Sequence, residues 1–278
     1  MRFEKWQALG NDYLIVEEAE LPWALTPARV RGLCHPNFGP GGDGVLLLSR
    51  AEAPHVAHLR IFNPDGSEAE LSGNGAREAA MYVHARGWTT DGQFSMITAA
   101  GVVQPVVLDS RNCRMAIGTA SLAGPDFPDG PADGSGMVSV GSESRAFQFV
   151  HVGNPQVAIH FDSVEEVDAL DLASVGPSIQ ADPRFPNRTN VSFWAHAGDG
   201  IRARIFERGV GETMSSGTGS TGAAVAAVLG GLPSPVSVKL DGGDLVVSVD
   251  PDLGLELTGW AIPVYAATLA PETVEDLT

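Results

Sequence analysis

Short apolar runs separated by glycine, proline and polar residues recur along the whole chain, and this pattern is typical of strands joined by turns. In the first half, the runs predict strands at residues 2–8, 13–17, 44–48, 58–62, 94–98, 102–108 and 113–117. In the second half, they predict strands at residues 146–152, 156–161, 190–195, 201–206, 236–240, 245–249 and 255–258. The chain is therefore expected to consist mainly of β-structure.

A few stretches with the helical spacing of apolar residues interrupt this β pattern. Each half has one principal helix directly after a Gly-x-Gly sequence, predicted at residues 74–85 and 218–229. Shorter helices are predicted at residues 27–34 and 167–175. Residues 123–144 are rich in Pro, Gly, Asp and Ser, so we predict that they connect the two halves.

The two halves share one sequence signature. RIFNPDGSEAELSGNG begins at Arg60 and RIFERGVGETMSSGTG begins at Arg204, and the two segments align without a gap. Gly10-Asn11 and Gly153-Asn154 recur at nearly the same spacing, about half of the chain length. Such an internal repeat indicates a duplicated structural unit.

The duplication predicts an α+β fold with two pseudo-symmetric lobes. Residues 1–118 are expected to form the N-terminal lobe, completed by residues 262–278, and residues 119–261 are expected to form the C-terminal lobe. Each lobe then contains one copy of the strand, turn and helix that make up the repeat.

Composition and charge limit the classes of molecule that the protein is expected to bind. The 278 residues carry a formal net charge of -17, which repels the phosphates of nucleic acids and anionic membranes. The most apolar stretch, residues 223–229, is too short to cross a bilayer. Cys34 and Cys113 lack metal-type spacing and fit a reducing compartment. We expect a cytoplasmic protein that acts on a small molecule and binds neither nucleic acid nor membrane, and a homodimer is left open.

The repeated turns, Ser72-Gly-Asn-Gly and Ser216-Gly-Thr-Gly, have a chemical meaning. Their glycines leave backbone N–H groups open to a ligand, and the following helix N-terminus attracts an anion such as a carboxylate. Two opposed serines beside one carboxylate would allow a proton to leave one face of an α-carbon and return to the other. The alternative is that both serines serve only as helix N-caps.

In combination, these features resemble the diaminopimelate epimerase family over essentially the whole chain. The resemblance implies that each lobe is a β-sheet or barrel wrapped around a central helix. It also implies a cofactor-independent isomerase that interconverts LL- and meso-diaminopimelate in lysine biosynthesis. The motifs that carry it are Ala8-Leu9-Gly10-Asn11-Asp12-Tyr13, Gly41-Gly42-Asp43-Gly44, Phe62-Asn63-Pro64-Asp65-Gly66-Ser67-Glu68, Ser72-Gly73-Asn74-Gly75, Gly153-Asn154-Pro155, Asn190-Val191, Glu207-Arg208-Gly209-Val210-Gly211-Glu212-Thr213 and Ser216-Gly217-Thr218-Gly219.

The resemblance also implies which residues form the site. Ser72 and Ser216 occupy the positions of the catalytic acid and base. Glu207 is suited to accept a hydrogen bond from an ammonium group, and Arg208 is suited to hold a carboxylate with two hydrogen bonds. The full set expected to bind the amino-acid substrate, including the residues of the two turns, is Asn11, Asn63, Gly73, Asn74, Asn154, Asn190, Glu207, Arg208, Gly217 and Thr218.

The chain departs from the family at the catalytic positions, because the family's acid and base are cysteines. A hydroxyl is a far weaker acid than a thiol and needs a neighbouring base. The turns contain no His or Lys; His151 is the nearest candidate, and the simpler interpretation is an ordinary strand histidine. Three explanations stay open: an engineered double replacement, a natural enzyme with help from other residues, or a diverged member with changed or lost activity. Glu78, Gly44 and Gln156 also differ from common family residues, which favours natural divergence.

Other chemistries fit less well. A pyridoxal-phosphate racemase needs a Schiff-base lysine, and Lys5 and Lys239 both fall on predicted strands outside the motifs. His55 and His58 are the one close histidine pair, so no metal site and no cofactor are expected. Two alternatives remain: an amino-acid binding protein that kept the site without the chemistry, and a different cofactor-independent isomerase that uses carboxylates.

Overall fold

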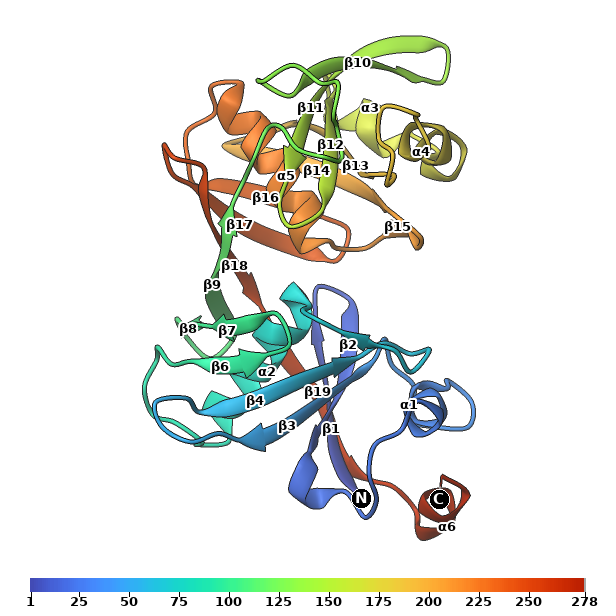
Figure 1. Ribbon diagram of the computed structural model, residues 1–278, viewed down its shortest axis with the longest axis vertical. Helices are drawn as coiled ribbons and strands as arrows, with labels where there is room; N and C mark the ends of the chain where they lie inside the picture. Colours follow the sequence, from blue (N-terminus) through green and yellow to red (C-terminus); the bar gives the residue numbers. More distant parts are fainter. Residues whose placement is uncertain (278) are drawn as a thin grey trace. The chain divides into compact units, whose positions relative to one another are not determined.

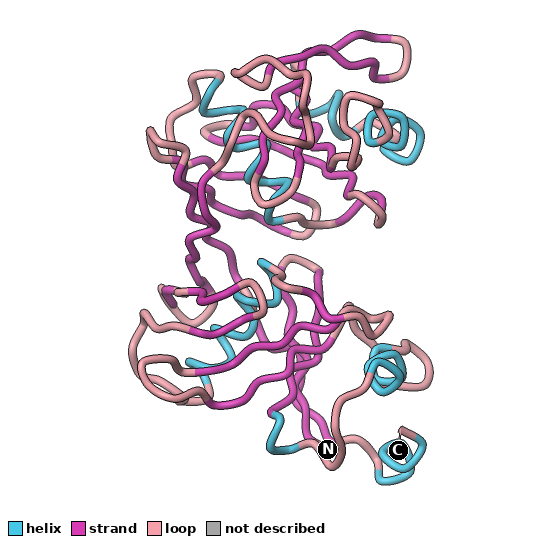
Figure 2. Tube along the Cα trace, in the orientation of Figure 1, coloured by secondary structure: helices cyan, strands magenta, loops and turns pink. Residues whose placement is uncertain are grey.

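The computed structural model describes residues 1–277 and contains two compact units, each with a sheet and a central helix (Figure 1). Unit 1 comprises Met1–Met115 and the segment from Gly259 onward, and unit 2 comprises Ala116–Thr258. The boundaries expected from the sequence, after residues 118 and 261, lie slightly further along the chain. Figure 2 shows that strands and loops make up most of both units. The predicted α+β class with two lobes is confirmed.

Unit 1 contains a mixed sheet with the strand order β19-β1-β2-β3-β4-β6-β7, and β5 pairs with β4. Its helix α2 packs against β1, β2, β3 and β4 and buries every residue from Asn74 to Val83. Its elements are β1 (Arg2–Ala8), β2 (Asn11–Glu17), a 3-10 helix (Glu18–Glu20), α1 (Pro27–Cys34), β3 (Val45–Arg50), β4 (Ala57–Phe62), β5 (Glu68–Ala69), α2 (Gly73–Ala85), β6 (Met96–Thr98), β7 (Gly101–Val103), β19 (Ile262–Thr268) and α6 (Pro271–Asp276).

Unit 2 contains the strand order β10-β11-β12-β13-β14-β16-β17-β18, and β15 pairs with β14. Beyond β18 this order continues through β9 (Asn112–Thr119) to β8 (Val106–Val107). The other elements are β10 (Ser135–Val140), β11 (Glu143–His151), β12 (Pro155–His160), α3 (Val164–Asp168), α4 (Leu172–Gln180), β13 (Asn190–Ala197), β14 (Gly200–Glu207), β15 (Gly211–Thr213), α5 (Gly217–Leu229), β16 (Val236–Leu240), β17 (Gly243–Val249) and β18 (Gly254–Trp260).

The duplication predicted from the sequence is visible strand by strand. The order β1-β2-β3-β4-β6-β7 in unit 1 corresponds to β11-β12-β13-β14-β16-β17 in unit 2. Parallel pairing also falls at the same places, between β2 and β3, β4 and β6, β12 and β13, and β14 and β16. The C-terminal strand β19 takes in unit 1 the edge position that β10 takes in unit 2, so the end of the chain completes the first sheet.

Small residues let α5 lie close to its sheet. A Cβ at Gly219 would lie 2.7 Å from Cγ2 of Ile205, and a Cβ at Gly222 would lie 2.8 Å from Cβ of Gln156. Alanine, serine and threonine fill most of the other buried positions of α5. The Gly-rich repeat therefore has a packing role as well as a place at the start of the helix.

Three local predictions were wrong. Residues 123–144 do not form a simple connection, because Ser135–Val140 pairs with β11 as an edge strand. The single helix predicted at 167–175 is two helices, since Asp171 accepts a hydrogen bond from the Ser174 N–H and starts α4 afresh. The strand predicted at 102–108 is divided into β7 and β8 around Pro105, which has no N–H to donate.

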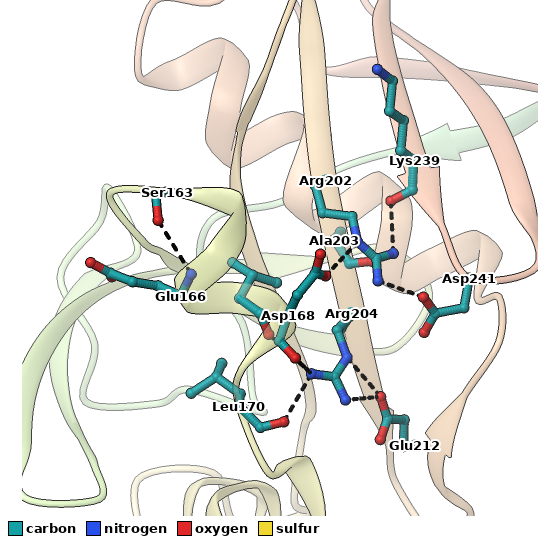
Figure 3. Close-up of polar contacts among 11 residues, drawn as sticks. Ser163, Glu166, Asp168, Leu170, Arg202, Ala203, Arg204, Glu212, Lys239 and Asp241 are labelled. Carbon is teal, nitrogen blue, oxygen red and sulfur yellow. Dashed lines mark hydrogen bonds and ion pairs between the residues drawn. The ribbon is translucent and has the colours of Figure 1, made fainter.

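The repeated Arg-Ile-Phe and Glu residues form the same ion pair in both units. Arg60 Nε donates to Glu68 at 2.8 Å, and Arg204 Nε donates to Glu212 at 2.9 Å. In unit 2, the guanidinium also donates to three carbonyl oxygens at the end of α3, as Figure 3 shows for Asp168 and Leu170. Arg204 is 14% exposed and Arg60 is 51% exposed, so only the unit 2 guanidinium is largely removed from water, whereas Glu68 and Glu212 are about equally exposed.

We expect Arg204→Met to lower the free energy of unfolding by about 2 kcal/mol, because it leaves the three carbonyl oxygens at the end of α3 without their donor. Arg60→Met removes the equivalent exposed pair and is expected to cost about 0.5 kcal/mol. Urea denaturation of both variants measures the difference. Equal losses would show that the contacts of Arg204 with α3 contribute nothing to stability.

Candidate active site

Both turn serines cap the helices that follow them. Ser72 Oγ accepts a hydrogen bond from the Gly75 N–H at 3.1 Å, and Ser216 Oγ accepts one from the Gly219 N–H at 3.1 Å. Both serines are therefore helix N-caps, which does not exclude a second role for either hydroxyl. Capping fixes each hydroxyl at a helix N-terminus, where backbone N–H groups and the helix dipole favour negative charge.

In each unit, the residue that follows Ser-Gly forms a side-chain hydrogen bond with the asparagine of the Gly-Asn pair. In unit 1, the Asn74 amide donates to Asn11 Oδ1 at 3.3 Å. In unit 2, the Asn154 amide donates to Thr218 Oγ1 at 3.4 Å. The structure thus brings together two predicted substrate-binding residues in each unit and repeats the contact, as the duplication requires.

In unit 1, charged side chains hold the cluster formed by Asn11 and Asn74. The Asn11 amide donates to Asp43 Oδ2 at 2.9 Å. The buried Arg77 guanidinium donates to Asn74 Oδ1, which orients that amide. Burial lowers the pKa of Arg77 to about 10.

Asn63 stands apart from this cluster. Its amide donates to Ser67 Oγ at 3.0 Å, and its backbone carbonyl accepts from the Gly66 N–H at 2.9 Å. This side-chain hydrogen bond stays within its own turn. The described residues therefore show no direct hydrogen bond between Asn63 and Asn11.

The predicted unit 2 residues are linked through the backbone next to Arg208. Asn190 Oδ1 accepts from the Arg208 N–H at 2.7 Å, and the Arg208 guanidinium donates to the Asn187 carbonyl at 2.8 Å. Burial raises the pKa of Glu207, and the hydroxyl of Ser216 partly reverses this shift by hydrogen bonding to the carboxyl. The structure thus joins Asn190 directly to Arg208 within unit 2.

Tyr13 is a site residue that the sequence analysis missed. Its hydroxyl lies 3.2 Å from Ser72 Oγ, and its side chain is buried. From the sequence, a partner for the serine was expected only among His and Lys residues, with His151 as the nearest candidate, whereas this partner is a tyrosine on β2. The signal was present, because Tyr13 directly follows Gly10-Asn11-Asp12 in a motif assigned to the site.

Gly44 makes the space that the Tyr13 ring occupies. A Cβ at Gly44 would lie 2.6 Å from Cε1 of Tyr13 and 2.3 Å from the Phe62 carbonyl oxygen. Real Cβ atoms do not approach other atoms so closely, so a larger residue at 44 would displace the ring. The unusual glycine at 44 and the tyrosine at 13 therefore belong to one arrangement.

Glu78, also flagged as unusual, is fully buried on α2. Neither carboxyl oxygen makes a well-aligned hydrogen bond with any of the described residues. Burial raises the pKa of Glu78 well above its ordinary value, and the Arg77 charge and the Tyr13 backbone N–H only partly oppose this. Burial therefore favours the protonated, neutral form of this carboxyl.

The other titratable candidates, His151, Lys5 and Lys239, all lie on strands. His151 lies on β11 with Nε2 at 3.3 Å from Asp126 Oδ2, so its interpretation as a strand histidine is confirmed. Lys5 and Lys239 lie on β1 and β16, as predicted. Within the described part of the chain, no three His, Cys, Asp or Glu side chains are grouped as metal ligands, and no helix has the length and apolarity to span a bilayer.

Comparison with known proteins agrees with this arrangement. The model of the family described as diaminopimelate epimerase matches residues 3–123 and 148–261. The chain belongs to the diaminopimelate epimerase family. A relative named diaminopimelate epimerase 2, from Nostoc sp., is 37% identical over 278 aligned residues, which cover 98% of this chain and 96% of the relative.

Solved structures share the fold at much lower identity. A hydroxyproline epimerase from Agrobacterium vitis has a TM-score of 0.63 and 15% identity, covering 99% of this chain and 94% of that one. A PhzF-family phenazine biosynthesis protein from Bacillus anthracis has a TM-score of 0.65 and 15% identity, covering 97% and 99%. Diaminopimelate epimerases are cofactor-independent isomerases, so the chain belongs to an enzyme family, and the isomerase class and the fold predicted from the sequence are confirmed.

Proposed function

We propose that this protein binds diaminopimelate, or a close analogue, and that Ser72 and Ser216 act on its α-carbon as acid and base. The observation that carries the proposal is the pair of capped Ser-Gly-x-Gly turns, each joined to a substrate-type asparagine in its own unit. Each turn offers N–H donors to a carboxylate and a hydroxyl beside it.

The proposed substrate contacts follow from the chemistry of the retained residues. Gly73 and Asn74 in one turn, with Gly217 and Thr218 in the other, are proposed to bind the carboxylate next to the reacting carbon. Asn11, Asn63, Asn154, Asn190, Glu207 and Arg208 are proposed to bind the distal amino-acid end. A carboxylate and a guanidinium match the ammonium and carboxylate of such a zwitterion.

Serine limits the chemistry in this proposal. A hydroxyl gives up its proton much less readily than a thiol, so epimerisation is expected to be slow or absent in the native protein. A diverged binding protein would keep the ligand and show no proton exchange even with thiols restored. A different cofactor-independent isomerase would not bind diaminopimelate.

We further propose a cytoplasmic location, which the two unbridged cysteines, Cys34 and Cys113, support. Their burial raises the pKa of each thiol, that of Cys34 to about 12 and that of Cys113 to about 11. Neither is therefore suited to replace a catalytic cysteine. The strongly acidic chain supports a small-molecule partner rather than nucleic acid, and a homodimer remains open to a sedimentation measurement.

Calorimetric titration with LL- and meso-diaminopimelate tests the substrate. We expect heat of binding with at least one isomer and none with lysine, which lacks the distal carboxylate. Arg208→Gln is expected to weaken binding about 100-fold, because it removes a charged donor to a carboxylate. The control is Arg111→Gln, an exposed arginine in unit 1, which should bind as the native protein does. Absence of heat with both isomers, where a known epimerase responds, would reject diaminopimelate.

A further inference from the structure

The two serines have different hydrogen-bond partners, although their turns are copies of each other. Ser72 Oγ receives the Gly75 N–H at 3.1 Å and the Tyr13 hydroxyl at 3.2 Å. A hydroxyl oxygen has two acceptor lone pairs and one hydrogen to donate. With both lone pairs engaged, Ser72 retains only its own hydrogen for a ligand, so it is set to donate.

Ser216 lacks the second of these partners in unit 2. Its oxygen also receives a helix N–H, from Gly219 at 3.1 Å. Among the described residues, this N–H is the one hydrogen-bond donor to Ser216 Oγ, so one of its lone pairs stays open.

The position equivalent to Tyr13 supports this contrast. In the repeat, Gln156 on β12 stands where Tyr13 stands on β2. The Gln156 amide donates to Asn154 Oδ1 at 2.6 Å, so it serves the neighbouring asparagine and not the serine. The phenol is thus a feature of unit 1 alone, and Gly44 is the residue that admits it.

We propose that Tyr13 is a positioning residue that holds the Ser72 hydroxyl so that its hydrogen is left for a ligand, a constraint that Ser216 lacks. This inference rests on the proposed function. It adds a residue of unit 1 and distinguishes two serines that the sequence had treated alike.

The Tyr13 hydroxyl can also supply a proton to Ser72. When the carbanion electron pair of a substrate takes the Ser72 hydroxyl proton, a C–H bond forms, the Ser72 O–H bond breaks, and Tyr13 gives its own proton to Ser72 Oγ. Solvent then restores the proton to the Tyr13 phenolate. Burial raises the pKa of Tyr13 to about 12, yet a phenolate is still a far better anion than a serine alkoxide.

A thiol introduced at position 72 reports on the Tyr13 hydroxyl without any turnover. The alkylation rate of the Ser72→Cys variant, followed against pH by peptide mass mapping, gives the pKa of the new thiol. The measurement is repeated after adding Tyr13→Phe. Mapping separates the signal from Cys34 and Cys113, which are buried.

A hydroxyl that donates to the thiolate lowers the thiol pKa, so Tyr13→Phe is expected to raise that pKa by about one unit. Alkylation at pH 7 should then be about tenfold slower. The matched control is Ser216→Cys, whose thiol pKa should be unchanged by Tyr13→Phe. An equal thiol pKa at position 72 with tyrosine and phenylalanine, in variants with native melting curves, would overturn the proposal. No substrate is present, so this result is independent of whether diaminopimelate binds.

Discussion

Glu78→Gln is expected to make the protein more stable at pH 8 while changing its stability little at pH 5. The native carboxyl is fully buried, and burial raises its pKa well above the ordinary value near 4.5. The folded state therefore holds this proton more tightly than the unfolded state does. The resulting stabilisation is complete below about pH 4.5 and is lost as the pH rises toward the folded pKa.

Each pH unit in that interval costs about 1.4 kcal/mol, so the native protein is expected to lose stability progressively between pH 5 and the folded pKa. Thermal unfolding at pH 5 and pH 8 measures it, and Glu78→Gln should narrow the difference in Tm between the two conditions by several degrees. The control is Glu70→Gln, an exposed carboxyl in the same unit, which should keep the native pH dependence. An unchanged pH dependence in Glu78→Gln would show that the buried carboxyl does not titrate in this range.

Much of the fold was predictable because the signals were local. Hydrophobic runs gave most strands, and the sequence repeat correctly predicted two equivalent units. The helix predicted at 27–34 has those bounds in the structure, since Thr26 accepts from the Arg29 N–H and Pro27 begins the helix. Such caps and prolines act within a few residues and can be read without knowing the fold.

The errors arose where long-range pairing outweighed composition. Ser135–Val140 lies in a Pro- and Gly-rich stretch, yet β11 supplies a partner for it. Likewise, Ile262–Thr268 was not predicted as a strand, and it pairs with β1 from the other end of the chain. Propensity does not report such partners, because a strand is stabilised by its neighbours as much as by its own residues.

The candidate site shows the same difference between local signals and long-range contacts. The motifs identified Ser72, Ser216 and the asparagines, and the structure joins Asn11 with Asn74 and Asn154 with Thr218. Tyr13 was missed because its hydroxyl reaches Ser72 from a separate strand, a contact that depends on the open space at Gly44. Gly44 and Glu78 were recognised in the sequence as unusual for the family. The contact of Tyr13 at Gly44 and the burial of Glu78 became evident only from the packing of side chains.

Restoring thiols with Ser72→Cys and Ser216→Cys together is expected to raise the rate of α-proton exchange at least about 100-fold. A thiol close to neutral pKa accepts and donates a proton far more readily than a hydroxyl, and general acid–base catalysis contributes factors of this size. Ser72→Ala with Ser216→Ala is the matched control, since it removes both groups and should abolish exchange.

Deuterium incorporation into LL-diaminopimelate in D2O, followed by NMR for the native, double-cysteine and double-alanine proteins, tests the central claim directly. The account predicts slow or undetectable incorporation with the native protein, rapid incorporation with Ser72→Cys/Ser216→Cys, and none with the alanine variant. Rapid incorporation with native serines would contradict the acidity argument. No gain in a folded double-cysteine variant that binds the substrate would contradict the assignment of Ser72 and Ser216 as acid and base.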